Sequence, residues 1–228
     1  KIVEIGGLGP GPFAGTMFSD MGADVLRIDR RGAADPPVTM TDARGRHTIA
    51  LDLKDPAAIS RCLEICDQAD VVFEGYRPGV MERLGLGPDV MLKRNPALVY
   101  GRMTGWGQDG PYANMAGHDI NYLGLTGALH AIGTEDKPLP PLNLVADYGG
   151  GGMMLVVGIL AALIDARATG KGQVIDAAIC DGVTYLMSLF YGMKAAGAWQ
   201  DKRSSNLLDG AAPFYDTYQC ADGEWIAI

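Results

Sequence analysis

Hydrophobic and polar positions near the N-terminus predict a strand, a helix and a second strand in close succession. Residues 1–5 (KIVEI) have the apolar character of a short buried strand, which the Gly- and Pro-rich run 6–12 interrupts. Residues 13–21 carry helical periodicity and are followed by Gly22, a residue type that favours the C-terminal ends of helices. The apolar strand 24–29 (DVLRID) comes directly afterwards. This order is that of a βαβ unit, whose two strands lie parallel.

The alternation of strand-like and helix-like segments continues along the chain. Apolar runs predict further strands at 47–53, 70–76 and 173–179, and residues 97–107 predict a strand that runs into a Gly-rich loop. Helical patterns predict helices at 56–69 with Asp55 as its N-cap, 119–129, 153–168 and 182–196. The segment 153–168 is nearly all apolar, so we expect that helix to be buried in the core. The pattern predicts an α/β fold: a Rossmann-like large domain with a mainly parallel sheet.

The C-terminal residues have a different character. Residues 199–210, which include DKRSSN, are polar and are predicted to be a linker after a large domain that spans 1–198. Residues 211–228 have the pattern of a β-hairpin with ADGE at its turn, and we expect this hairpin to start a smaller α+β domain. Lys1 at one end and the strand-like EWIAI at the other indicate a chain that is truncated at both ends.

Charge and composition limit the possible partners. The formal net charge is −8, which gives no electrostatic support to a nucleic-acid partner. An anionic ligand would need a local group of Arg and Lys side chains. The apolar stretch 153–164 is too short to span a bilayer, so no membrane partner is expected. The four cysteines are scattered and have no histidine at a zinc-binding spacing, so no metal site is predicted.

The first turn imitates a dinucleotide-binding fingerprint. Gly7, Gly9 and Gly11 follow the first predicted strand, and Asp29 comes about twenty residues later. That fingerprint requires backbone N–H groups directed at a pyrophosphate, and the prolines within this turn have none. We therefore interpret the glycines as a device for a tight turn and close packing.

Basic residues follow several of the predicted strands. Arg30 and Arg31 follow the second strand, Lys54 the third and Arg77 the fourth, with Arg83 one or two helical turns later. Ligands of open α/β sheets bind outside the carboxyl ends of the strands, so these cations indicate a polyphosphate ligand. The alternative is that each is a solvated surface charge.

His118 stands at the predicted start of the helix 119–129, directly after Gly117. The positive end of the helix dipole favours the neutral imidazole there, which is the form that acts as a base. Backbone N–H groups at the same helix start, such as that of Asp119, could bind an oxyanion. The alternative is a capping segment in which Asp119 is the N-cap and His118 is merely local and polar.

Asp147 is a second candidate for proton transfer. It follows an apolar Leu-Val-Ala segment that is interpreted as a strand, and it precedes four glycines and the apolar helix. Apolar surroundings raise the proton affinity of a carboxylate, as a general base or acid requires, and the glycines let a ligand approach the backbone. The alternative is a helix-capping aspartate.

Eight blocks of this sequence are long and specific: GLGPGPFAGTMFSDMGADVLRIDR (7–30), LDLK (51–54), EGYRPGVMERLGLGP (74–88), YGRMTGWGQDGPY (100–112), AGHDINY (116–122), PPLNLVADYGGGG (140–152), GKGQVIDAAICDG (170–182) and LLDGAAPFYDTY (207–218). Together they resemble the alpha-methylacyl-CoA racemases, which belong to the family III CoA-transferase superfamily (CaiB/BaiF-like). The resemblance covers residues 1–228.

The resemblance implies an isomerase that inverts the α-carbon of 2-methyl-branched acyl-CoA thioesters by 1,1-proton transfer. His118 and Asp147 would be bases on opposite faces of that carbon, and the backbone N–H of Asp119 would stabilise the enolate oxygen. No metal or redox cofactor is implied. The family's third catalytic residue, a Glu, falls beyond Ile228, and the family forms interlocked homodimers.

The resemblance also implies a CoA site, with the acyl chain over a Met-rich surface. The residues expected to bind CoA are Arg30, Leu51, Asp52, Leu53, Lys54, Gly75, Tyr76, Arg77, Arg83, Gly117, Asp119, Ile120, Asn121 and Tyr122.

Other functions remain open at this stage. In a family III CoA-transferase the aspartate matching Asp147 is a nucleophile, and a residue other than histidine typically stands at the position of His118. A non-catalytic CoA-binding module and an NAD-dependent dehydrogenase are the further alternatives. The expected compartment is the bacterial cytoplasm, or the peroxisome or mitochondrion of a eukaryote.

Overall fold

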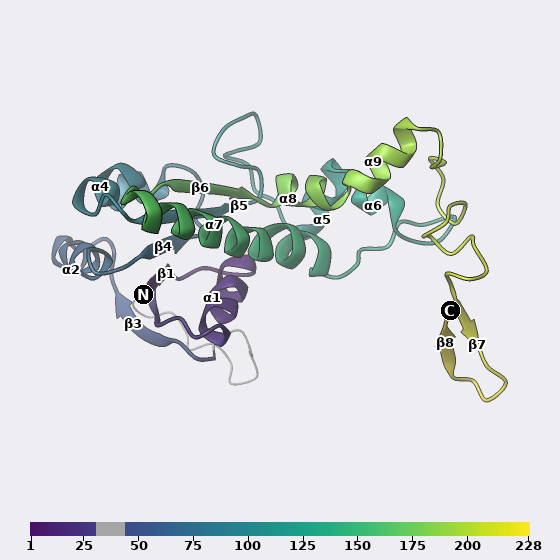
Figure 1. Ribbon diagram of the computed structural model, residues 1–228, viewed down its shortest axis with the longest axis horizontal. Coiled ribbons are helices and arrows are strands. Elements are labelled where there is room, and N and C mark those ends of the chain that lie inside the picture. The colour runs from purple at the N-terminus through teal and green to yellow at the C-terminus, as the bar shows by residue number, and fades with distance from the viewer. Residues whose placement is uncertain (31–43) are drawn as a thin grey trace.

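A parallel sheet forms the centre of the computed structural model, which describes residues 1–30 and 44–228 (Figure 1). In this described part the sheet has six strands in the order β3-β2-β1-β4-β5-β6. The strands are β1 (Ile2–Ile5), β2 (Val25–Arg30), β3 (His47–Leu51), β4 (Val71–Glu74), β5 (Val99–Thr104) and β6 (Val174–Ala178). All are paired in parallel. This is the Rossmann strand order, in which the chain reverses its direction of progress between β1 and β4. The predicted fold class is confirmed.

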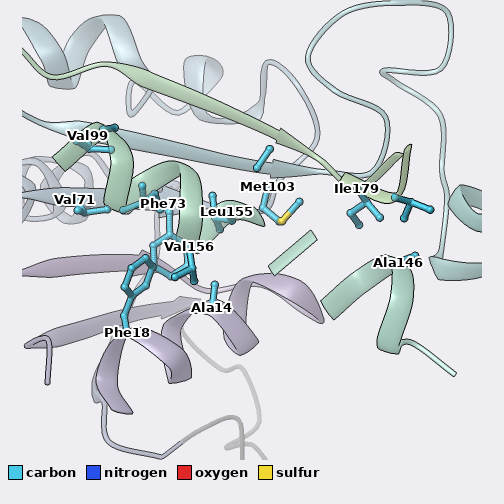
Figure 2. Close-up of a cluster of buried hydrophobic side chains, with 14 of the residues drawn as sticks. Ala14, Phe18, Val71, Phe73, Val99, Met103, Ala146, Leu155, Val156 and Ile179 are labelled. Carbon is cyan, nitrogen blue, oxygen red and sulfur yellow. The ribbon is translucent and has the colours of Figure 1, made fainter. Parts of the chain in front are cut away.

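Helices cover both faces of this sheet, because successive residues of each buried strand point to opposite faces. Ile2 of β1 packs in one hydrophobic cluster with α1 (Pro10–Asp20) and α7 (Met154–Thr169). Val3, its neighbour, packs in a second cluster with α2 (Pro56–Cys66) and α4 (Pro88–Arg94). Figure 2 shows the first cluster, where side chains of α1 and α7 meet those of β4 and β5. The sheet is therefore the middle of three layers.

Several shorter helices complete the large unit. They are α3 (Val80–Arg83), α5 (Asp119–Leu125), α6 (Ala128–Ala131), α8 (Ile179–Leu186), α9 (Ser188–Ala195) and a π-helix, η2 (Leu144–Met153). The π-helix packs against α8, α1 and α5 and runs directly into α7. It is thus placed between the sheet-covering helices and the segment that contains His118.

The sequence prediction of a strand before Asp147 is wrong. The Leu-Val-Ala segment before Asp147 is the first turn of η2 and not a strand. The glycines explain this: a Cβ on Gly150 would lie 2.8 Å from the backbone N of Val183, and a Cβ on Gly182 would lie 1.8 Å from the backbone O of Gly150. Only glycine permits η2 and α8 to approach this closely. The close helix–helix packing therefore overrides the strand-like pattern of the apolar residues.

The predicted helices 119–129 and 182–196 are each divided in two. Gly127, with a left-handed φ of 78°, separates α5 from α6, and Met187 separates α8 from α9. The predicted end of the first helix is confirmed, since α1 stops at Asp20 and Gly22 takes a φ of 89° shortly after it. Asp55 caps α2 as expected, because its side chain accepts a hydrogen bond from the N–H of Ala57 at 3.0 Å.

The apolar helix is buried on one side only. Leu155 and Ile159 of α7 are fully buried, but Val157 and Ile164 are 57% and 73% exposed, so the prediction of a helix buried in the core holds for one face of α7. With η2 it forms the 26-residue helical stretch Leu144–Thr169, which is long and apolar enough to cross a membrane. This helical stretch is longer than the apolar run 153–164, whose length predicts no membrane span. Its inner face packs on the sheet, as the core helix of a globular protein does.

The last residues form the expected hairpin, β7 (Thr217–Gln219) paired antiparallel with β8 (Trp225–Ala227), which extends away from the large sheet (Figure 1). The segment before it is attached to the large unit, because the guanidinium of Arg203 donates hydrogen bonds to the backbone carbonyls of His130, Thr134 and Glu135. The division at residues 199–210 stays a prediction.

Candidate active site

A cavity of about 440 Å³ opens at the carboxyl ends of β1, β4 and β5. This position is the point where the strand order reverses, which is where open α/β sheets bind their ligands. Residues from the loops after these strands, from the start of α5 and from η2 line the cavity. They are Leu8, Gly9, Pro10, Gly75, Tyr76, Arg77, Pro78, Met103, Thr104, Gly105, Trp106, Ala113, Met115, Ala116, Gly117, His118, Tyr122, Asp147 and Ile179.

Both candidate bases lie in this cavity, although they are far apart in the sequence. His118 is the N-cap of α5, and its backbone N–H donates a hydrogen bond to the side-chain oxygen of Asn121 at 2.9 Å. The capping role considered for Asp119 is therefore taken by His118, and Asp119 is the first residue of the helix. The His118 side chain is exposed and lines the cavity. The fold thus leaves the imidazole accessible to a ligand.

Asp147 faces the cavity from η2 and is half-buried. Burial, and after it the nearby charge of Asp119, raise the pKa of Asp147 to about 6, against a lowering effect of His118. The loop after β1 lies beside the carboxylate: a Cβ on Gly9, whose φ is 68°, would be 3.5 Å from Asp147 Oδ2. A carboxyl group with a pKa near 6 can both accept and return a proton close to neutral pH.

Aromatic side chains form one wall of the cavity. The rings of Trp106 and Tyr122 meet edge to face with centroids 4.7 Å apart, and Trp106 also contacts Tyr112 at 5.3 Å. Glycines make room for them, because a Cβ on Gly105 would lie 2.2 Å from the ring of Tyr122 and one on Gly117 2.8 Å from that of Trp106. The indole N–H of Trp106 is buried and has no hydrogen-bond partner within the part of the chain that the structure describes.

Burial and the charge of Asp147 raise the pKa of Tyr122 to about 12, so its phenol stays protonated at neutral pH. The wall therefore combines apolar ring surface with polar N–H and O–H groups, as ligand sites commonly do.

A buried ionic network holds the loop that follows β4. Glu74 accepts a hydrogen bond from the backbone N–H of Tyr76 at 2.6 Å and another from Arg102 at 3.3 Å. Arg102 also pairs with Glu82 at 2.8 Å. Burial raises the pKa of Glu74 to about 7, against the lowering effects of the Tyr76 N–H and Arg102. The network fixes the segment that brings Tyr76 and Arg77 to the cavity.

The cavity brings together seven of the residues predicted from the sequence: Gly75, Tyr76, Arg77, Gly117, His118, Tyr122 and Asp147. The remaining predicted residues do not line it; they are Arg30, Leu51, Asp52, Leu53, Lys54, Arg83, Asp119, Ile120 and Asn121. Arg30 and Leu51 do lie side by side, as register partners at the ends of β2 and β3. Arg31, the other cation noted in the sequence, lies outside the described residues.

Sequence reasoning missed part of the cavity lining. The prolines of the loop after β1 argue against pyrophosphate binding, yet Gly9 and Pro10 line the cavity beside Asp147. Trp106 follows β5, and a glycine-rich segment after a strand at the reversal point was the available signal for it. Chemically, the arrangement offers an imidazole and a carboxyl group of raised pKa to one ligand, with an arginine close by.

Comparison with known proteins shows the family to which this chain belongs. The model of CoA-transferase family III matches residues 1–228. The alpha-methylacyl-CoA racemases of mouse and human are each 46% identical over 229 residues, which covers 100% of this chain. A crystal structure of a CAIB/BAIF family protein from Brucella suis superposes with a TM-score of 0.85 at 28% identity, and covers 100% of this chain and 64% of that one. The chain spans 59% of the length of the two racemases.

Proposed function

This chain belongs to CoA-transferase family III, and from that premise we propose that it is the larger part of an alpha-methylacyl-CoA racemase. The proposed reaction inverts the α-carbon of a 2-methyl-branched acyl-CoA thioester. The observation that carries the proposal is the meeting of His118 and Asp147 in one cavity, in a chain that is similar throughout to proteins named alpha-methylacyl-CoA racemase. No metal or redox cofactor takes part in the proposed reaction.

In the proposed mechanism one base removes the α-proton and the other returns a proton to the opposite face. The thioester carbonyl becomes an enolate oxygen between these two steps, and the backbone N–H of Asp119 stabilises its charge. This N–H belongs to the first residue of α5 and has no partner within the helix. The raised pKa of Asp147 supports its role, because an acid and base near neutral pH needs a pKa near 6 to 7.

The CoA moiety is proposed to run from the cavity across the carboxyl edge of the sheet. Tyr76 and Arg77 line the cavity, whereas Arg30 ends the neighbouring strand β2 and Lys54 follows β3. Phosphates of the nucleotide would lie near these cations, outside the cavity itself. Residues 51–54 and Arg83, expected from the resemblance, belong to this outer part.

The alternative function is a family III CoA-transferase. In that reaction the Asp147 carboxylate attacks the thioester carbonyl and expels the CoA thiolate. The thiolate then attacks the aspartyl carbonyl of the mixed anhydride, which releases the acyl group as a free carboxylate and leaves an aspartyl-CoA thioester. The family model itself carries the transferase name, so the family alone does not decide between the two. The presence of a histidine at position 118 favours the racemase.

One experiment separates the two functions. The full-length protein is incubated in D₂O with a single epimer of a 2-methylacyl-CoA and with a free carboxylic acid. NMR follows loss of the α-proton, and chromatography follows configuration and any new acyl-CoA. A racemase exchanges the proton and forms the other epimer. Transfer of CoA to the free acid without exchange would overturn the proposal and make Asp147 a nucleophile.

A further inference from the structure

The side chain of Asp119 connects the two candidate bases. Its Oδ2 accepts a hydrogen bond from the backbone N–H of Asp147 at 2.8 Å, across 28 residues of sequence. Asp119 also follows His118 directly and is the first residue of the helix that His118 caps. One aspartate is therefore joined by covalent bonds to one base and by a hydrogen bond to the backbone of the other.

The side chain of Asp119 binds the backbone N–H of Asp147, which has no hydrogen-bond partner within the π-helix itself. In a π-helix each N–H bonds to the carbonyl five residues earlier, so the first amides have no partner within the helix. In η2 the bond from Tyr148 N–H to Asn143 O, at 3.1 Å, is the earliest in that pattern. The N–H of Asp147 comes immediately before it. The carboxylate of α5 thus caps η2 from outside, at the residue whose side chain enters the cavity.

We propose that the Asp119 carboxylate is the positioning residue of Asp147: it fixes the second base relative to the first and sets the charge that this base meets. The proposal rests on the proposed racemase function. It gives the side chain of Asp119 a role separate from the backbone N–H that binds the enolate oxygen.

The charged groups around Asp147 support the second half of this proposal. At the start of α5, His118 lowers the pKa of Asp147 and Asp119 raises it. Tyr122 lies in the same helix, and the charge of Asp147 raises the pKa of its phenol. Arg77 lines the cavity after β4. Asp181 and Cys180 lie in the first turn of α8, which packs on both α5 and η2.

Among these groups Asp119 is the one that both raises the pKa of Asp147 and is hydrogen-bonded to its backbone. Burial raises the pKa of Asp119 itself, while the amides of Asp147 and Ala146 lower it. The same carboxylate thus supplies the fixed position and the like charge.

Two variants separate the hydrogen bond from the charge. Asp119→Asn keeps an oxygen that can accept from the Asp147 N–H but removes the negative charge, whereas Asp119→Ala removes both. Asp176→Asn is the matched control, since Asp176 also accepts a hydrogen bond from a distant loop amide, that of Gln108 at 3.1 Å. The full-length proteins are compared by the pH profile of kcat/KM in the direction in which Asp147 removes the proton.

In Asp119→Asn we expect the acid limb of this profile to move to lower pH by roughly half to one unit, because removal of a like charge lowers the pKa of Asp147. In Asp119→Ala we expect kcat to fall roughly tenfold to a hundredfold with little change in KM, because the base is no longer held in place. Asp176→Asn should leave the limb in its original position. An unmoved limb in Asp119→Asn together with equal kcat in the Asn and Ala variants would overturn the proposal.

The pKa of Asp147 can also be measured without turnover. In protein labelled with ¹³C at aspartate carboxyl carbons, NMR titration should give a lower pKa for Asp147 in Asp119→Asn than in the wild type. If the wild type shows no α-proton exchange, the racemase function fails while this titration still tests the link between the two aspartates. An equal pKa of Asp147 in both proteins would refute that link.

Discussion

Asp147 in the cavity and Glu74 inside the sheet are two carboxyl groups whose pKa values burial raises, to about 6 and about 7 respectively. Their surroundings differ. Glu74 is 1% exposed, and its oxygens accept hydrogen bonds from Arg102 and from the Tyr76 amide. Asp147 is half-buried beside the like charge of Asp119 and faces an open cavity.

The difference shows why a raised pKa does not by itself identify a base. Glu74 lies where a substrate cannot reach it, and its partners fix the loop that carries Tyr76. Asp147 lies where the strand order reverses, with its carboxylate directed at ligand space. Burial is the largest cause of the pKa shift in both groups, and only the access of a ligand separates a structural from a chemical role.

The largest effect is expected on removing the carboxyl group in the cavity. Asp147→Ala should lower kcat for racemisation by roughly a hundredfold to ten-thousandfold, because general acid–base catalysis by one positioned group supplies roughly 10²–10⁴ in rate. Affinity for free CoA should be retained, since the proposed role of this carboxyl group is at the α-carbon. Rates of racemisation and binding of CoA by calorimetry check this. An unchanged rate would exclude Asp147 from the reaction.

Glu74 should instead affect how the free energy of unfolding depends on pH. Its folded pKa of about 7 exceeds its ordinary value of 4.5, so the folded protein holds this proton more tightly than the unfolded chain does. The resulting stabilisation is fully present below pH 4.5 and is lost as pH rises through about 7. Between these values the free energy of unfolding of the wild type should fall by on the order of 3 kcal/mol relative to Glu74→Gln.

Urea denaturation of both proteins at several pH values measures this difference. If the free energy of unfolding changes equally with pH in Glu74→Gln and in the wild type, Glu74 does not hold a proton near neutral pH. Asp147→Asn is the control, because its half-exposed carboxyl group should contribute a smaller slope.

The two groups can also be separated by the pH dependence of activity. In the direction in which Asp147 is the base, kcat/KM should rise with pH through about 6 and level off, because the carboxylate is the active form. At pH values well below 6, kcat/KM should change tenfold for each unit of pH. Glu74→Gln should show the limb at the same pH. If the acid limb disappears in Glu74→Gln, the group that titrates in this pH range is Glu74 and not Asp147.

A smaller effect is expected at the edge of the sheet. Arg30→Ala should weaken CoA binding by roughly tenfold, the size of one exposed charge-assisted contact, with less effect on the rate at saturation. Arg30 is exposed at the end of β2 and does not line the cavity. Titration calorimetry with CoA at two salt concentrations measures the change, and a normal affinity would remove Arg30 from the site.

The fold could be predicted largely because parallel strands and their helices have strong local patterns. The strands around Val25–Arg30 and Val71–Glu74 are short apolar runs between turn residues, and both positions were predicted within a few residues. The π-helix could not be predicted, because an apolar segment before glycines has no distinctive period. Its conformation depends on the contact of Gly150 with α8, which is distant in sequence.

Part of the candidate site could also be predicted from local sequence patterns. His118 and Asp147 stand next to helix starts, and local sequence reveals such positions. Trp106 and the loop around Gly9 enter the cavity through the order of the strands, which no single segment encodes. The hydrogen bond from Asp147 to Asp119 likewise appears only when η2 and α5 are packed together.

His118 and Asp147 are proposed to act from opposite faces of the α-carbon, and single-base variants test this most directly. His118→Asn and Asp147→Asn in the full-length protein are incubated in D₂O with each pure epimer of a 2-methylacyl-CoA. Each variant should exchange the α-proton of one epimer without inversion, through its remaining base, and the two variants should select opposite epimers. Exchange of the same epimer by both variants, or inversion at the wild-type rate in either, would contradict the account.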